Sequence, residues 1–200
     1  AALEAVDYKA LQLDGDTLTK TKPVYVDLSG IAKGYGVDAV ARALDDLGVS
    51  RYLVEVGGEI RTRGSKPGEQ PWRIAVEKPV SNERSVQRII ELDDSAVATS
   101  GDYRNYFESD GKRYSHTIDP RTGRPITHHL VSVTVITADC MTADALATAI
   151  DVMGPDAGFA MAERENLAVY LVVKTPEGFE TRVSTAFQNY LKDSEEEDQS

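Results

Sequence analysis

The 200-residue sequence has one cysteine, few basic residues and no long apolar run. The single Cys140 excludes an intramolecular disulfide. The 22 basic residues are outnumbered by 33 acidic ones, and the net charge of −11 argues against a general nucleic-acid binder, which needs a basic face. No segment is long and apolar enough to span a membrane, and neither a signal peptide nor an initiator Met is present. We therefore expect a processed product or a fragment.

The composition is that of a globular protein, with 41% hydrophobic and 28% charged residues. This length and balance predict a single domain over residues 1–192. Residues 193–200 hold five acidic side chains in eight positions, which is typical of a disordered, solvated tail.

The pattern of apolar residues predicts an α+β sandwich, in which helices flank a mixed, largely antiparallel sheet. A helix is expected to start at Ser29 and run to residue 47, with Val40 on its apolar face. A second helix should be opened by Thr142 and end at residue 153, and a third should span 155–165. Strands are expected at 7–13, 18–26, 52–56, 59–62, 72–77, 85–92, 96–99, 103–108, 113–118, 131–137, 168–174 and 179–183, with 131–137 half buried.

Asp144 and Thr148 lie four residues apart among Ala and Leu, so their side chains share one helix face. A carboxylate and a hydroxyl at this spacing offer two hard oxygen ligands, which suit Mg²⁺ when water and substrate phosphate fill its other positions. The alternative is an ordinary amphipathic helix, in which Thr148 bonds to a carbonyl and Asp144 stabilises the helix start.

Residues 26–36 run from a strand through a Gly-containing turn into a helix, and Lys33 lies in its first turns. Exposed amides at a helix start attract phosphate, and a bound anion would explain a lysine where the helix dipole disfavours positive charge. The glycine spacing fits neither a P-loop nor a dinucleotide fingerprint. The alternative is a plain capped helix with a solvated lysine.

Three further segments have both a functional and a structural interpretation. The Gly57–Gly58 pair lets the backbone approach a neighbour closely, or forms a simple tight connection. Residues 97–103 can line a ligand with Tyr103 stacked on it, or form a turn between strands. His116 precedes a Pro-Arg-Thr-Gly turn and is a candidate acid or base, because histidine titrates near neutrality, although a strand histidine can equally serve only in hydrogen bonding.

Five motifs occur in a specific order along the chain. They are DLSGIAKGY at 27–35, VGG at 56–58, TSGDY at 99–103, HTIDPRTG at 116–123 and TADALATA at 142–149. Together they resemble the ApbE-like flavin transferases, the FAD:protein FMN transferases, over about residues 24–191. The resemblance implies an enzyme that cleaves FAD with Mg²⁺ and attaches FMN through a phosphoester to a threonine of a target protein.

The resemblance also implies roles for single residues. Asp144 and Thr148 match the metal-binding residues of the family, and the Gly30 carbonyl would be a further ligand. Lys33 matches a position near the FAD phosphates. The cofactor pocket is matched by Asp27, His116 and Ile118. The base that activates the acceptor threonine stays unassigned, and His116 is a candidate for it.

Many members of the family are periplasmic lipoproteins that flavinylate membrane redox subunits, so the resemblance implies that location for the full-length protein and an acceptor of that kind. The family's N-terminal portion, with its lipoprotein signal and part of the FAD-binding surface, has no counterpart here. We therefore expect an incomplete catalyst. Two other hypotheses stay open, namely a protein that binds or hydrolyses FAD without transfer and a non-catalytic scaffold fragment.

Overall fold

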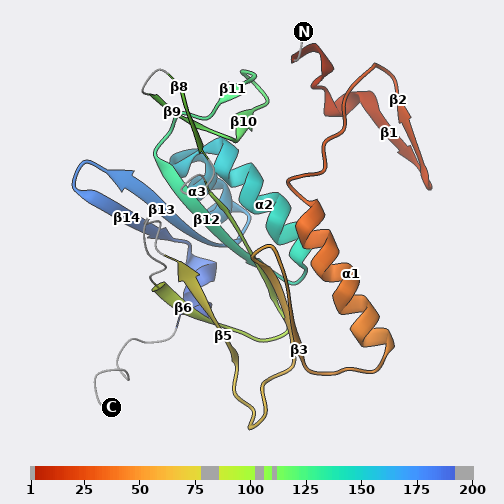
Figure 1. Cartoon of the computed structure of the whole chain (residues 1–200), viewed down its shortest axis with the longest axis vertical. Coiled ribbons are helices and arrows are strands. Elements are labelled where there is room, and N and C mark those ends of the chain that lie inside the picture. The colour runs from red at the N-terminus through yellow and green to blue at the C-terminus, as the bar shows by residue number, and fades with distance from the viewer. Residues whose placement is uncertain (1–2, 78–85, 102–105, 110–111, 192–200) are drawn as a thin grey trace.

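The computed structural model describes residues 3–77, 86–101, 106–109 and 112–191 (Figure 1). The predicted acidic tail at 193–200 lies outside these residues, and so do Asp102 and Tyr103 of the predicted 97–103 site.

A six-stranded sheet forms the centre of the fold, in the order β14-β13-β12-β7-β4-β3. Its strands are β3 (Tyr52–Val56), β4 (Glu59–Arg63), β7 (Ala96–Gly101), β12 (Leu130–Thr137), β13 (Ala168–Thr175) and β14 (Gly178–Val183). Each neighbouring pair in this sheet is antiparallel. The predicted α+β sandwich is therefore confirmed.

Three helices cover one face of this sheet, α1 (Ala32–Asp46), α2 (Cys140–Met153) and α3 (Pro155–Arg164). The hairpin β5–β6 (Trp72–Glu77 and Val86–Leu92) and the 3-10 helix η3 (Thr185–Tyr190) pack on the other face. Figure 1 shows α1 and α2 side by side, and they are in extensive contact. No helix in the described part of the chain has the length and apolar character needed to span a membrane.

The smaller elements lie around this sandwich. They are η1 (Leu3–Ala5), η2 (Tyr8–Ala10), β1 (Leu11–Asp14), β2 (Thr17–Lys20), β8 (Tyr106–Ser109), β9 (Lys112–Ser115), β10 (Ile118–Asp119) and β11 (Arg124–Pro125). The β1–β2 hairpin is shorter than the predicted one: the 3-10 helix η2 occupies residues 8–10 of the first predicted strand, and β2 ends at Lys20. It stands away from the sheet at the upper right of Figure 1.

Strand β12 is buried on both faces, so the expectation of a half-buried strand at 131–137 is wrong. Val133 and Val135 pack toward α2 and α3, whereas Ile136 packs toward β6 and η3. The alternation in the sequence is real, but both sides of the strand are covered because the sheet lies between two layers.

The helix starts also differ from the predicted ones. Helix α1 begins at Ala32 and its N-cap, Ile31, makes no side-chain cap, because the Ser29 hydroxyl bonds to Asp27 instead. The predicted apolar position Val40 is 46% exposed. Helix α2 begins at Cys140, and the Asp139 carboxylate caps it by accepting a 2.8 Å hydrogen bond from the Thr142 amide. Thr142 therefore lies within the first turn and does not open the helix.

Candidate functional site

The site begins where α1 crosses the start of α2, at Gly34. A Cβ atom at this position would lie 2.3 Å from the carbonyl oxygen of Cys140, so only glycine lets the helices approach this closely. The Gly34 amide then donates a 2.9 Å hydrogen bond to Oδ2 of Asp144, a carboxylate with only 2% exposure. The close crossing thus fixes Asp144 against the first turn of α1.

Asp38, one turn further along α1, also holds α1 and α2 together where they cross. Its carboxylate accepts hydrogen bonds from the first amides of α2, at 3.0 Å from Cys140 and 2.8 Å from Met141. The Arg61 guanidinium donates to the same carboxylate at 2.6 Å. A carboxylate from α1 therefore caps α2, where the helix dipole favours negative charge.

Thr148 lies one turn beyond Asp144 on α2, against the turn that precedes α1. A Cβ atom at Gly30 would be 3.3 Å from the Thr148 Oγ1 atom, and this hydroxyl shares a 3.3 Å hydrogen bond with Ser100 of β7. The fold thus brings the three predicted metal-binding residues, Gly30, Asp144 and Thr148, to one place.

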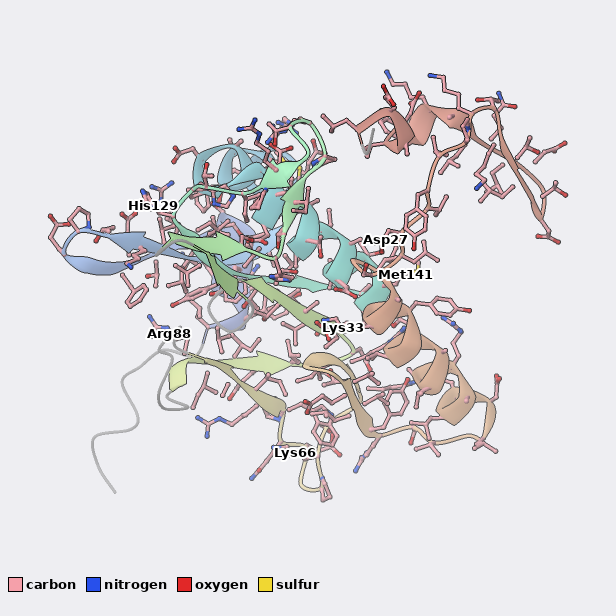
Figure 2. The ribbon with its side chains drawn as sticks, turned by 45° about the horizontal axis from the view of Figure 1, so that its top comes forward. Asp27, Lys33, Lys66, Arg88, His129 and Met141 are labelled. Carbon is pink, nitrogen blue, oxygen red and sulfur yellow. The ribbon has the colours of Figure 1, made fainter. Side chains whose placement is uncertain are left out.

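Lys33 points from the first turn of α1 to the β3–β4 turn, where its ammonium pairs with Oε1 of Glu59 (Lys33 is labelled in Figure 2). The turn consists of Gly57 and Gly58, with φ of 63° and 102°. A Cβ atom at Gly57 would lie 3.3 Å from Cδ of Lys33. Both interpretations of the glycine pair therefore hold, because it makes a tight connection and lets the lysine stem lie against the backbone.

Negative charge dominates the interior beneath this lysine. Burial raises the pKa of Glu59, Lys33 opposes that rise, and the nearby Asp144 adds to it. Burial, together with the charges of Asp38, Glu59 and Asp144, raises the pKa of the Cys140 thiol to about 12. Asp38 is paired with Arg61, but no salt-bridge partner of Asp144 is found among the described residues. A cation held by Asp144, Thr148 and the Gly30 carbonyl would balance this charge.

The ligand set is a sparse one for a metal. Within the described ranges, no group of three His, Cys, Asp or Glu side chains is placed to hold an ion. One carboxylate, one hydroxyl and one carbonyl nevertheless suit Mg²⁺, which binds through one or two carboxylates and keeps several positions for water and phosphate oxygens. The residues present therefore fit a magnesium ion shared with a phosphate ligand.

Lys33 also lines a cleft of about 660 Å³ on the opposite face of the sheet from α2. The cleft lies between the sheet and the β5–β6 hairpin, and the Gly57–Gly58 turn borders it. Its walls combine apolar and polar side chains, among them Ile60, Val97 and Thr134 of the sheet and Arg73, Ile74 and Ile90 of the hairpin. This volume and lining are typical of a site for a small organic ligand.

The three other predicted cofactor residues are all exposed. Asp27 accepts hydrogen bonds from the Ser29 hydroxyl and, at 2.7 Å, from the Ser29 amide, and these bonds lower the Asp27 pKa (Asp27 is labelled in Figure 2). His116 lies in the bend after β9, and Ile118 is 49% exposed. In the part of the chain that the structure describes, neither Asp27 nor Ile118 shares a hydrogen bond with the residues around Asp144.

The segment that carries His116 is nevertheless fastened to α2. Thr117, the next residue, donates a 3.2 Å hydrogen bond from its hydroxyl to Oδ2 of Asp151. Asp151 lies two turns beyond Asp144 on the same helix. The HTIDPRTG motif is therefore held against α2, the helix that also carries the TADALATA motif.

A model of the ApbE family matches residues 1–171, which is most of the chain. The chain belongs to the ApbE family. The match begins upstream of residue 24, where the motif-based resemblance starts, so it also includes the N-terminal hairpin.

Curated relatives of this ApbE-family chain carry the name FAD:protein FMN transferase. The protein from Vibrio cholerae serotype O1 is 56% identical over 182 residues, which cover 90% of this chain and 54% of the relative. The protein from Escherichia coli K12 is 47% identical over 168 residues, or 84% of this chain and 48% of the relative. The chain thus spans about half the length of the curated relatives it matches.

Solved structures show the same fold. The flavin transferase ApbE from Vibrio cholerae superposes with a TM-score of 0.85 at 52% identity, over 94% of this chain and 60% of that one. The ApbE protein from Thermotoga maritima superposes with a TM-score of 0.84 at 36% identity, over 96% of this chain and 62% of that one. The arrangement of sheet and helices is thus that of known ApbE structures.

Sequence reasoning missed two buried acids that build this ApbE-family site, Asp38 and Glu59. Asp38 lies four residues after Gly34 and three before Ala41, so it is a charged residue within a buried helix stripe. Glu59 directly follows the glycine pair. The position of Asp38 within an apolar helix stripe can be recognised in the sequence, whereas no local sequence pattern shows that Glu59 is buried.

Proposed function

We propose that this chain carries the metal- and phosphate-binding part of an FAD:protein FMN transferase, which moves FMN from FAD to a threonine of an acceptor protein and uses Mg²⁺. One observation carries the proposal. Gly30, Asp144 and Thr148 come together where α1 crosses α2, and Lys33 extends from the first turn of α1 into a cleft. The names of the relatives support the same reaction.

The residues divide the work as follows. Asp144, Thr148 and the Gly30 carbonyl would hold Mg²⁺, and the Ser100 hydroxyl keeps the Thr148 hydroxyl in place. When bound, Mg²⁺ would neutralise the charge that develops as the pyrophosphate bond breaks. Lys33 binds phosphate oxygens and orients the FMN phosphorus toward the acceptor.

The proposed reaction transfers the FMN phosphoryl group of FAD to the acceptor hydroxyl. The acceptor hydroxyl oxygen bonds to the FMN phosphorus, the bond from that phosphorus to the bridging oxygen breaks, and AMP leaves. The hydroxyl proton passes to a base. His116 is the candidate for this role, because its segment is fastened to α2 through Thr117 and Asp151.

By the family resemblance we also propose that the full-length protein is a periplasmic or membrane-anchored lipoprotein and that its acceptor is a membrane redox subunit.

The decisive experiment is incubation of the chain with FAD, Mg²⁺ and an acceptor domain, followed by intact mass measurement. Transfer adds the mass of FMN, less one water, to the acceptor, and it disappears with a Thr→Ala acceptor or with EDTA. Release of AMP and free FMN without labelling would favour an FAD hydrolase, and absence of FAD and Mg²⁺ binding would favour a scaffold. A version extended to the length of the relatives serves as the reference, and we expect it to react faster, because binding energy from remote parts of FAD helps to position the reacting phosphate.

A further inference from the structure

Glu59 is a buried carboxylate beside the cleft, and the proposed reaction gives it no role. It is 1% exposed at the first position of β4, directly after the glycine pair. Burying a charge is costly unless the charge is paired and hydrogen-bonded. Only half of this carboxylate is satisfied, because Oε1 pairs with Lys33 whereas Oε2 has no hydrogen-bond partner among the residues that the structure describes.

The two members of this ion pair face different surroundings. The Glu59 side chain is 2% exposed, whereas the Lys33 side chain is 47% exposed and lines the cleft. The Lys33 ammonium thus lies between a fixed buried carboxylate and the space open to a ligand. It has three N–H donors, so a phosphate in the cleft either shares it with Glu59 or draws it away.

We propose that Glu59 is an internal counter-ion that competes with phosphate for Lys33 and so weakens the binding of FAD and of the product AMP. This inference rests on the proposed role of Lys33 as a phosphate contact. The physical reason is that a carboxylate in contact with the ammonium offsets much of its attraction for an anion. Such weakening is useful in a transferase, because equal tightening of substrate and transition state does not speed the chemical step, and a tightly held product delays release.

The test is the equilibrium affinity for inorganic pyrophosphate and for AMP, at one fixed Mg²⁺ concentration, in the unaltered chain and in Glu59→Gln. Glutamine keeps the shape of the side chain and a hydrogen-bond acceptor for Lys33 but removes the charge. We expect Glu59→Gln to bind pyrophosphate at least about tenfold more tightly, which corresponds to about 1.4 kcal/mol.

The matched control is Glu180→Gln on β14. Like Glu59, Glu180 forms an ion pair, in its case with Arg182, but it is exposed and lies on the edge strand at the other end of the sheet from β3. Its replacement should leave pyrophosphate affinity unchanged. If both variants tighten binding equally, the effect is one of net charge and the inference is wrong.

Unchanged or weaker pyrophosphate binding by a folded Glu59→Gln chain would also overturn the inference. The double variant Lys33→Gln/Glu59→Gln then separates the two proposals. If the double variant binds pyrophosphate more weakly than Glu59→Gln does, Lys33 contacts phosphate and only the role of Glu59 is refuted. If all the variants bind pyrophosphate with the same affinity, the proposed phosphate contact of Lys33 is refuted as well. Should Glu59→Gln not fold, Glu59→Asp withdraws the carboxylate by one methylene and should tighten binding by a smaller factor, and affinity equal to that of the unaltered chain would refute the inference.

Discussion

Replacing Lys33 by alanine should destabilise the fold as well as weaken phosphate binding, because it leaves Glu59 buried without its cation. Breaking a buried ion pair costs about 3–5 kcal/mol. Lys33 itself is 47% exposed, so water partly replaces its ammonium, and we expect the smaller loss of about 1–3 kcal/mol that follows when a buried acceptor is left unpaired. The control is Lys174→Ala, which replaces an exposed lysine on β13. It should change the free energy of unfolding by no more than about 0.5 kcal/mol.

This loss depends on pH with a definite sign. Burial raises the folded-state pKa of Glu59 above its ordinary value of 4.5, and removing Lys33 removes the interaction that opposes the rise. A group with a raised folded pKa stabilises the fold below its unfolded pKa, and that contribution is lost as the pH rises through the folded pKa. The difference in unfolding free energy between the unaltered chain and Lys33→Ala should therefore be small below pH 4.5 and grow above it.

Urea unfolding of both chains between pH 4 and 8 measures this difference, and a double-mutant cycle with Glu59→Gln assigns it. In the Glu59→Gln background, Lys33→Ala should cost much less, because no charge is left buried. An equal cost at all pH values, or an equal cost in both backgrounds, would refute the reasoning. The same double-mutant cycle is needed when ligand affinity is measured, because Lys33→Ala can lower FAD affinity either by destabilising the fold or by removing a phosphate contact. Riboflavin has no phosphate, so a loss of affinity that is larger for FAD than for riboflavin shows that Lys33 contacts the phosphates.

Three further predictions concern the crossing of α1 and α2. Asp144→Asn keeps an oxygen for the Gly34 amide, so it should stay folded by circular dichroism yet lose Mg²⁺-dependent FAD turnover; unchanged turnover at saturating Mg²⁺ would contradict the metal assignment. Gly34→Ala should lower the free energy of unfolding in urea by about 1–3 kcal/mol, because its Cβ would meet the Cys140 carbonyl. The control Gly36→Ala, in the same helix, places its Cβ where nothing lies within 4 Å and should raise that free energy by up to about 1 kcal/mol. Cys140, fully buried with a pKa raised to about 12, should react with a thiol reagent at pH 8 only after denaturation, and rapid reaction in the native chain would refute its placement.

The local pattern of the sequence determined the elements with strong periodicity. Helix α2, predicted at 142–153, spans 140–153, and α3, predicted at 155–165, spans 155–164. The strand at 52–56 agrees with the prediction as well. The shared face of Asp144 and Thr148 also follows from helix geometry alone, since residues four apart lie one above the other.

Tertiary structure decided where these faces point and which charges meet. The contact between Gly34 and Asp144 joins residues 110 positions apart, and the pair of Lys33 and Glu59 joins residues 26 apart. No local pattern encodes such distances, because they depend on how the helices and the β3–β4 turn pack. The sequence by itself therefore identified the candidate oxygen ligands and Lys33, whereas only packing of α1 against α2 and the sheet decided that Glu59 lies buried beneath Lys33.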